Sequence, residues 1–189
     1  MPEENGSWTD DGRRATRWPG DESTLTEAIA DDLPGGRALD LATGEGRVAS
    51  VLADRGWSVD AVDISRAMLD RARDRRDERS AAAGRSGSID WILADVDSYC
   101  FPESVYDVVA IRFFDARDRL DAVKSALAPG GALVYEHHLQ SESAASGPGN
   151  QYRFESNELL DACADLTVRY YAEDPDRSLV RLVAYADTD

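Results

Sequence analysis

A short apolar run followed at once by a glycine-containing turn is the feature of this sequence that most restricts its fold. The run Ala38–Ala42 has the length of a buried strand, and the turn Thr43–Gly46 leads into a segment with apolar residues at helical spacing. Glycines allow the backbone to turn tightly after the strand and to approach a ligand closely. A strand, a glycine turn and a helix in this order predict the first crossover unit of a parallel α/β sheet.

Apolar runs and turn residues predict the remaining elements. Further strands are predicted at residues 57–63, 89–94, 106–111 and 132–136, the last one after a Pro-Gly-Gly turn at 129–131, with helices over Glu22–Leu33, from Ser65 onward and over Asn157–Cys163. Two β-rich segments, Leu166–Tyr171 and Leu179–Ala186, are joined by a polar turn and predict an antiparallel pair. Strand and helix are expected to alternate five times before this pair, so the expected fold is α/β: a three-layer Rossmann-like sandwich with a mostly parallel seven-stranded sheet and an antiparallel C-terminal hairpin strand.

Length and composition limit the number of domains, the location and the partners. The 189 residues suit one domain over residues 21–189, preceded by a polar segment over 1–20, with Trp8 and Trp18, that we expect to be flexible or to act as a lid. The net charge of −16 argues against nucleic acid, and no apolar run approaches the ~20 residues that span a bilayer. We expect a cytoplasmic monomer or homodimer. Cys100 and Cys163 form neither a disulfide framework nor a metal cluster, so no metal is expected.

The kind of charge is as informative as its amount. The acidic residues are 25 Asp and 12 Glu, and the basic ones are 20 Arg and the single Lys124. Short carboxylates hold water and add little apolar surface, whereas each lysine exposes an apolar stem. This composition resembles that of cytoplasmic proteins of extreme halophiles. The resemblance implies a protein whose folding weakens in low salt.

Three acidic residues lie in or at the ends of the first three predicted strands. Asp40 lies within the first strand, Asp63 ends the second and Asp95 ends the third. In a parallel sheet these carboxyl ends meet at one edge, where Asp63 can accept both hydroxyls of a ribose, Asp95 an amino hydrogen of adenine and Asp40 an ammonium group. Because Gly44-x-Gly46-x-x-Ala49 also fits the dinucleotide fingerprint, a nicotinamide-dependent reductase is an alternative, which the absence of a Tyr-x-x-x-Lys pair disfavours.

These segments together resemble the class I S-adenosylmethionine-dependent methyltransferases. Asp40–Arg47 is similar to the first motif of that class, with Ala42 in place of its first glycine, and Val62-Asp63 and Asp95-Val96 are similar to the second and third. The resemblance covers about residues 22–186 and is greatest to small-molecule enzymes of the tellurite-resistance and thiopurine type. It implies S-adenosylmethionine as cofactor, held by Asp40, Ala42, Gly44, Gly46, Arg47, Asp63, Ile64, Asp95 and Val96. For Asp40 the alternative is a buried acid satisfied by backbone amides.

The resemblance places the methyl acceptor after the fourth strand. Arg112 and Phe113 stand there, and Glu136 and His137 lie at the end of the fifth strand, so these four are the candidate catalytic residues. The alternatives are that Phe113 and Phe114 are core residues on the following helix while Arg112 pairs with a nearby acid, and that the histidines are surface residues. Residues 147–154 suit a flap over a small-molecule acceptor. Methyl transfer by in-line displacement is the expected activity, and a catalytically silent cofactor-binding regulatory or partner subunit is the second reading.

Overall fold

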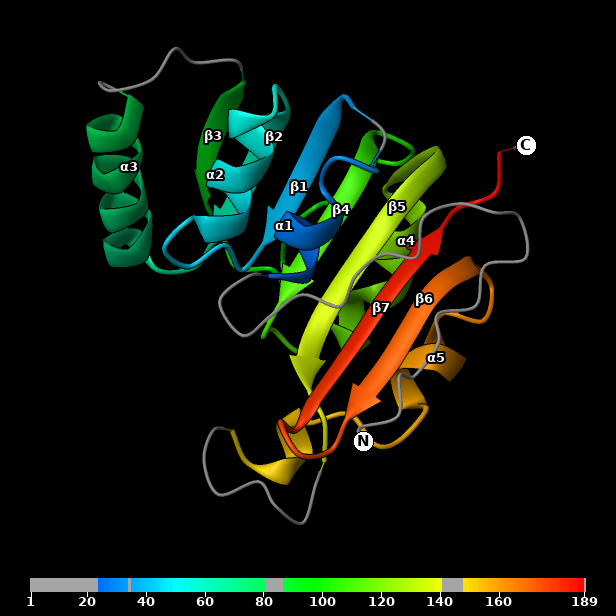
Figure 1. Ribbon diagram of the computed structural model, residues 1–189. Helices are drawn as coiled ribbons and strands as arrows, with labels where there is room; N and C mark the ends of the chain where they lie inside the picture. Colours follow the sequence, from blue (N-terminus) through cyan, green and yellow to red (C-terminus); the bar gives the residue numbers. More distant parts are fainter. Residues whose placement is uncertain (1–23, 34, 81–86, 141–147, 189) are drawn as a thin grey trace, which may run out of the picture.

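Seven strands form one twisted sheet in the computed structural model, which describes residues 24–33, 35–80, 87–140 and 148–188 (Figure 1). The order across the sheet is β3-β2-β1-β4-β5-β7-β6. The strands are β1 (Arg37–Leu41), β2 (Ser58–Asp63), β3 (Ser88–Leu93), β4 (Tyr106–Arg112), β5 (Leu127–His138), β6 (Thr167–Asp174) and β7 (Leu179–Tyr185). The predicted N-terminal segment, with Trp8 and Trp18, lies outside the described residues.

Strands β1 to β5 are parallel, and β7 pairs antiparallel with both β5 and β6. This confirms the predicted mostly parallel sheet with an antiparallel C-terminal addition. The strand order reverses between β1 and β4, which lie side by side at the centre of the sheet. In open α/β sheets, ligands bind beyond the carboxyl ends of the strands at such a reversal.

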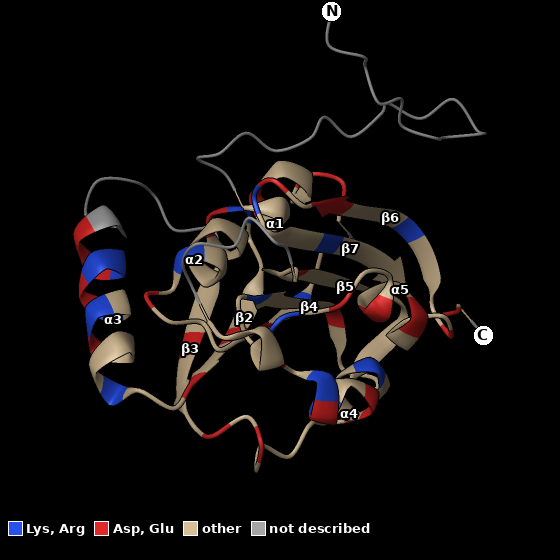
Figure 2. Cartoon of the chain, turned by 90° about the horizontal axis from the view of Figure 1, so that it is seen from below, with Lys and Arg blue, Asp and Glu red and all other residues tan. Residues whose placement is uncertain are grey.

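The helices cover both faces of the sheet. They are α1 (Leu25–Ile29), α2 (Arg47–Asp54), α3 (Arg66–Ser80), α4 (Leu120–Ser125) and α5 (Glu158–Ala162), and two 3₁₀ turns span Arg117–Arg119 and Asn150–Tyr152. Figure 2, seen from below, shows α1 and α2 on one side of the sheet and α4 and α5 on the other, with α3 beside β3. No helix in the described ranges is long and apolar enough to cross a membrane.

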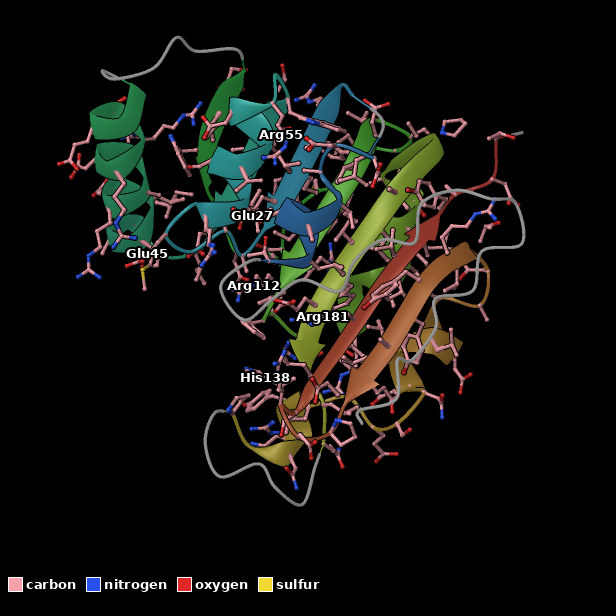
Figure 3. All side chains as sticks on the ribbon, in the orientation of Figure 1. Glu27, Glu45, Arg55, Arg112, His138 and Arg181 are labelled. Carbon is pink, nitrogen blue, oxygen red and sulfur yellow. The ribbon has the colours of Figure 1, made fainter. Side chains whose placement is uncertain are left out.

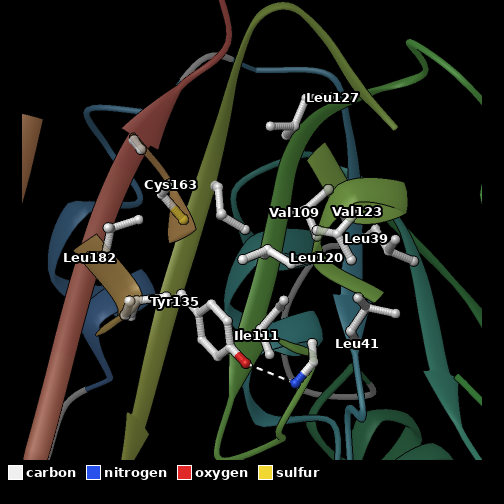
Figure 4. Packing of buried hydrophobic residues seen from close by; sticks show 14 of the residues in the cluster. Leu39, Leu41, Val109, Ile111, Leu120, Val123, Leu127, Tyr135, Cys163 and Leu182 are labelled. Atoms are coloured by element: carbon white, nitrogen blue, oxygen red, sulfur yellow. Dashed lines mark hydrogen bonds between the residues drawn. The ribbon is translucent and has the colours of Figure 1, made fainter. Parts of the chain in front are cut away.

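Strand alternation divides the core between the two faces. Leu39, Ile111 and Tyr135 belong to the cluster beneath α4 and α5, which Figure 4 shows, whereas the neighbouring Ala38 and Ala110 belong to the cluster beneath α1 and α2. Nearly all of these side chains are buried. Because β1 and β4 are buried on both faces, they read in the sequence as continuous apolar runs.

Three elements differ from the sequence-based expectations. The first described helix begins at Leu25, which Thr24 precedes as N-cap, and ends at Ile29, well before Leu33. The Pro-Gly-Gly turn lies inside β5, because Gly130 donates to the Asp187 carbonyl and the Gly131 carbonyl accepts from Ala186. The β–α alternation is interrupted between β3 and β4, where residues 94–105 form turns without a helix.

Candidate functional site

The side chain of Asp40 fixes the turn between β1 and α2 through hydrogen bonds. Its Oδ2 atom accepts hydrogen bonds from Thr43 Oγ1 at 2.5 Å and from the Ala49 amide at 2.9 Å. The residue is only 2% exposed, and burial raises the pKa of its carboxyl group to about 7. This geometry favours the alternative reading, in which Asp40 is a buried acid that fixes the turn.

The two glycines of the turn have different roles. Both adopt left-handed conformations, with φ of 55° at Gly44 and 72° at Gly46. A Cβ atom on Gly46 would lie 2.6 Å from the Trp91 ring and 2.9 Å from Ala72 Cβ, whereas one on Gly44 would meet nothing within 4 Å. Gly46 is therefore required by packing against β3 and α3, and Gly44 leaves open space in front of the turn. Ala42 also has a positive φ of 53°, where the related motif has glycine.

Asp63 at the end of β2 joins this turn to the next strand. Its Oδ2 atom accepts from the Gly44 amide at 2.8 Å, and its Oδ1 atom accepts from the Ser65 amide at 2.8 Å. Each carboxylate oxygen carries two lone pairs, so one acceptor position remains on each oxygen. Two such positions match the two hydroxyl donors of a ribose.

Exposed apolar side chains flank Asp63. Ile64, which directly follows β2, is 68% exposed, and Leu93, at the end of β3, is 45% exposed. Asp95 is exposed, as a role in contacting an adenine edge requires, but Val96 is 3% exposed and packs in the core. Arg47 points away toward α1, where its guanidinium lies 3.3 Å from Glu27.

On the acceptor side, Glu136 lies between two arginines on neighbouring strands. Cross-strand register places it opposite Arg112 of β4 and Arg181 of β7. Arg112 Nε donates to Glu136 Oε1 at 2.7 Å, and Arg181 Nε donates to Oε2 at 2.6 Å; Figure 3 labels the two arginines. Glu136 is only 3% exposed and is paired with both arginines, so it is not placed to act as a base. Arg112 pairs with a nearby acid, as its alternative reading held.

The loop after β4 presents one phenylalanine outward and packs the other inward. Phe113 is 38% exposed with a left-handed φ of 56°, and Phe114 packs partly against the core. Neither lies on a helix, contrary to the core reading. Tyr135 of β5 fixes the loop, because its hydroxyl donates to the Phe114 carbonyl at 2.8 Å and accepts from the Ala116 amide at 2.9 Å (Figure 4).

A cavity of about 840 Å³ opens beside this loop. It lies beyond the carboxyl ends of β4 and β5, next to the face on which Gly44 and Asp63 are found. Pro148, Gln151 and Tyr152, from the segment predicted as a flap, line one side of it. The cavity is lined by Asp97, Phe113, Phe114, Asp115, Arg117, Asp118, His137, His138, Pro148, Gln151 and Tyr152.

The two histidines of β5 differ in their surroundings. His137 is 3% exposed, and its Nε2 lies 2.8 Å from the Tyr152 carbonyl, so that nitrogen carries the proton. Its Nδ1 is buried without a partner in the described part of the chain, and burial lowers its pKa to about 4. His137 is therefore a buried residue that binds Tyr152 in the cavity wall. It is neither a surface residue nor an accessible base.

Two further residues, Tyr135 and Arg117, fix the loop beside the cavity and were not singled out from the sequence. The Arg117 guanidinium donates to both oxygens of Asp115, to Glu158 at 2.9 Å and to the Gln151 carbonyl at 2.6 Å. Arg117 thereby ties the loop after β4 to α5 and to the cavity wall. An Asp-x-Arg spacing was the available signal, but only the folded chain brings Glu158 and Gln151 to it. No group of three metal-ligating side chains occurs among the described residues.

Solved structures of other proteins share the fold of this chain. The solved structure of TehB from Haemophilus influenzae has a TM-score of 0.70 at 17% identity, over 84% of this chain and 60% of that one. The [4+2]-cyclase SpnF also has a TM-score of 0.70, at 19% identity, over 97% and 87%. These likenesses establish the seven-stranded α/β methyltransferase fold.

Sequence comparison agrees with this fold. Residues 38–131 match the family described as methyltransferase domain. The ubiquinone/menaquinone biosynthesis C-methyltransferase UbiE of Ectopseudomonas mendocina is 34% identical over 110 residues, which are 53% of this chain. The chain spans about two fifths of the length of that relative, 41%. Over residues 38–131 the chain is therefore similar to methyltransferases, for which S-adenosylmethionine is the expected cofactor.

The residues around the β1–α2 turn fit that cofactor. The space before Gly44, the free acceptor positions on Asp63 and the exposed Ile64 and Leu93 suit a methionine part, a ribose and an adenine ring respectively. The sheet thus offers a carboxylate for the sugar and apolar surface for the base on adjacent strand ends.

Proposed function

We propose that this chain transfers a methyl group from S-adenosylmethionine to a small-molecule acceptor bound in the cavity beyond β4 and β5. When bound, the cofactor supplies an electrophilic methyl group, and in-line displacement by the acceptor completes the reaction. The observation that supports the proposal is that the open space before Gly44, the acceptor positions on Asp63 and the 840 Å³ cavity all lie at the edge of the sheet where the parallel strands end.

Each residue of the site would have a distinct role in binding the cofactor or in aligning the acceptor. Asp63 would accept the ribose hydroxyls, Ile64 and Leu93 would cover the adenine, and Asp95 would accept its amino hydrogen. Asp40 would hold the turn, and Gly44 would leave room for the methionine part. Phe113 would close the cavity next to the reacting methyl group and exclude water.

Asp63→Ala tests the cofactor assignment. Loss of the acceptor for two ribose hydroxyls should weaken S-adenosylhomocysteine binding by about 1–3 kcal/mol, or about 5- to 150-fold, in calorimetry. Asp90→Ala is the matched control, since Asp90 is an exposed aspartate in the middle of β3, away from the strand ends. Equal affinity in both variants would remove Asp63 from the site.

A methyl-release assay over thiols, oxyanions and phenols separates the enzyme from the silent-subunit alternative. The alternative merits this test because the fold also occurs in a cyclase. Cofactor binding without transfer to any acceptor of the panel would favour the silent subunit. We infer an acceptor of the kind used by small-molecule methyltransferases of the tellurite-resistance and thiopurine type.

The acidic composition supports a further part of the proposal: a cytoplasmic protein of a high-salt cell, monomeric or homodimeric. With a charge of −16 and one lysine, self-repulsion in the folded state should be relieved by salt. The melting temperature should rise from dilute to molar KCl, and light scattering measures the oligomeric state. A melting temperature that does not change with KCl would contradict the salt adaptation.

A further inference from the structure

The side chain of His138, the last residue of β5, lies at the cavity and is oriented by ring stacking. It stacks on Phe113 with ring centroids 4.6 Å apart and planes 16° from parallel. The Arg112 guanidinium lies 4.2 Å from the centroid of the same Phe113 ring, and Arg112 is itself fixed by Glu136. Figure 3 shows His138 just beyond Arg112 and Arg181 at the end of β5. The imidazole is therefore oriented, although it is only half-buried.

The nitrogens of this oriented ring are available. Within the described ranges, neither nitrogen of His138 has a hydrogen-bond partner, whereas His137 uses Nε2 for the Tyr152 carbonyl. His138 lines the cavity and is not sealed from it, because its side chain is partly exposed. Of the two neighbours, His138 is the one that a molecule in the cavity can reach.

Burial, and after it the neighbouring arginines, favour the neutral form of this histidine. Burial, Arg153 and Arg112 lower the pKa of His138, and Glu136 opposes them while held between its two arginines. Neutral imidazole has one nitrogen with a lone pair, so it accepts a hydrogen bond at pH 7. The other titratable groups on the cavity wall are Asp97, Asp115, Arg117, Asp118 and His137, among which Asp115 and Arg117 are paired with each other.

Aromatic surface forms the rest of the reachable wall. Phe113 is 38% and Tyr152 is 53% exposed, and both line the cavity with His138. Exposed aromatic rings gathered in one cavity favour a flat ligand that stacks on them. The cavity therefore combines a stacking surface with an oriented hydrogen-bond acceptor.

We propose that His138 is the catalytic base for an aromatic acceptor that carries a hydroxyl or thiol group. This inference rests on the proposed methyl transfer. The proton of the acceptor O–H or S–H group passes to the free nitrogen of His138. The acceptor forms a bond to the methyl carbon, the carbon–sulfur bond of the sulfonium breaks, and its electron pair stays on sulfur. The imidazolium then releases the proton to water.

Imidazole NMR on the full chain saturated with S-adenosylhomocysteine tests the contact without relying on turnover. The chain has two histidines, so His138→Gln assigns both sets of signals. Titration with 4-methylphenol or 4-methylbenzenethiol should shift the His138 nitrogen signals saturably and leave those of His137 nearly unchanged. Failure of both probes to bind, or binding without a His138 shift, overturns the inference. Failure of S-adenosylhomocysteine to bind refutes the proposed function instead.

A kinetic comparison separates a base from a structural support. His138→Gln should slow transfer to 4-methylphenol by about 100-fold, the usual contribution of a positioned base. Transfer to 4-nitrophenol at pH 8, where most of this phenol is ionised, should fall by less than about threefold, because no proton has to be removed. Equal losses with both phenols would mean that the ring only supports Phe113, and would overturn the role as base.

Discussion

Substituting each glycine of the β1–α2 turn by alanine separates packing from ligand access. In Gly46→Ala the new Cβ would lie 2.6 Å from the Trp91 ring and 2.9 Å from Ala72 Cβ, at a φ of 72°. The left-handed conformation costs about 1–2 kcal/mol for a side chain, and overpacking adds about 1–3 kcal/mol. Gly46→Ala should therefore lower the free energy of unfolding by about 2–5 kcal/mol. Gly44→Ala, with open space at its Cβ, should lose only the conformational part, about 1–2 kcal/mol.

Urea unfolding followed by circular dichroism measures these losses, and S-adenosylhomocysteine calorimetry measures the other consequence. Gly44→Ala should lose affinity by at least about tenfold, because its methyl group enters the space through which the ligand approaches the backbone. Gly46→Ala should keep its affinity under conditions in which it is folded. In a double-mutant cycle, Trp91→Leu should recover about 1–2 kcal/mol of the Gly46→Ala loss. Equal destabilisation by both alanines, or no coupling to Trp91, would refute this division of roles.

Three further predictions concern stability. Ala42→Gly should raise the free energy of unfolding by about 1 kcal/mol in urea titration, because it relieves a φ of 53°; a loss would show that no strain resides there. The pKa of His137 is about 4 when folded and about 6.5 when unfolded, so the unfolded chain binds the extra proton between these values, and the contribution of His137 to stability should fall by about 2–3 kcal/mol as pH drops from 6.5 to 4. This contribution is the difference in unfolding free energy between the native chain and His137→Gln at each pH, and a difference that does not change with pH would contradict it. Glu136→Gln should cost about 3 kcal/mol by removing the buried negative charge that faces the buried Arg181, whereas Arg112→Ala, at a partly exposed cation, should cost about 1 kcal/mol; equal losses would contradict the ranking.

The raised pKa of Asp40 acts in the opposite direction to that of His137. With a folded pKa of about 7 and an ordinary unfolded value, Asp40 binds its proton more tightly in the folded chain. Its stabilising effect is complete below the unfolded pKa and is lost as pH rises toward 7. The difference between the native chain and His137→Gln isolates the histidine from this contribution.

Local patterns were sufficient to predict the sheet. Buried parallel strands such as β1 are continuous apolar runs, and their order follows from crossover rules, so the fold and the positions of Asp40 and Asp63 could be deduced. The extent of β5 could not, because hydrogen bonds from residues 186–187 near the end of the chain extend the ladder through a Pro-Gly-Gly segment that reads locally as a turn.

The acceptor side depends on contacts between distant segments. The pairing of Glu136 with both Arg112 and Arg181 follows from the register of three strands, which spacing alone does not fix. The same holds for the histidines: alternation shows that His137 and His138 face opposite ways, but only the Tyr152 carbonyl shows which one is already used. The local sequence also does not show why residue 46 has to be glycine, because the reason is the close approach of the Trp91 ring from β3.

Calorimetry of the purified chain with S-adenosylhomocysteine, with NAD as the competing ligand, is the most direct test of the cofactor assignment. The account predicts saturable binding of one S-adenosylhomocysteine molecule per chain, little or no heat with NAD, and about 5- to 150-fold weaker binding of S-adenosylhomocysteine by Asp63→Ala. Binding of NAD in place of S-adenosylhomocysteine, or of neither, would contradict it.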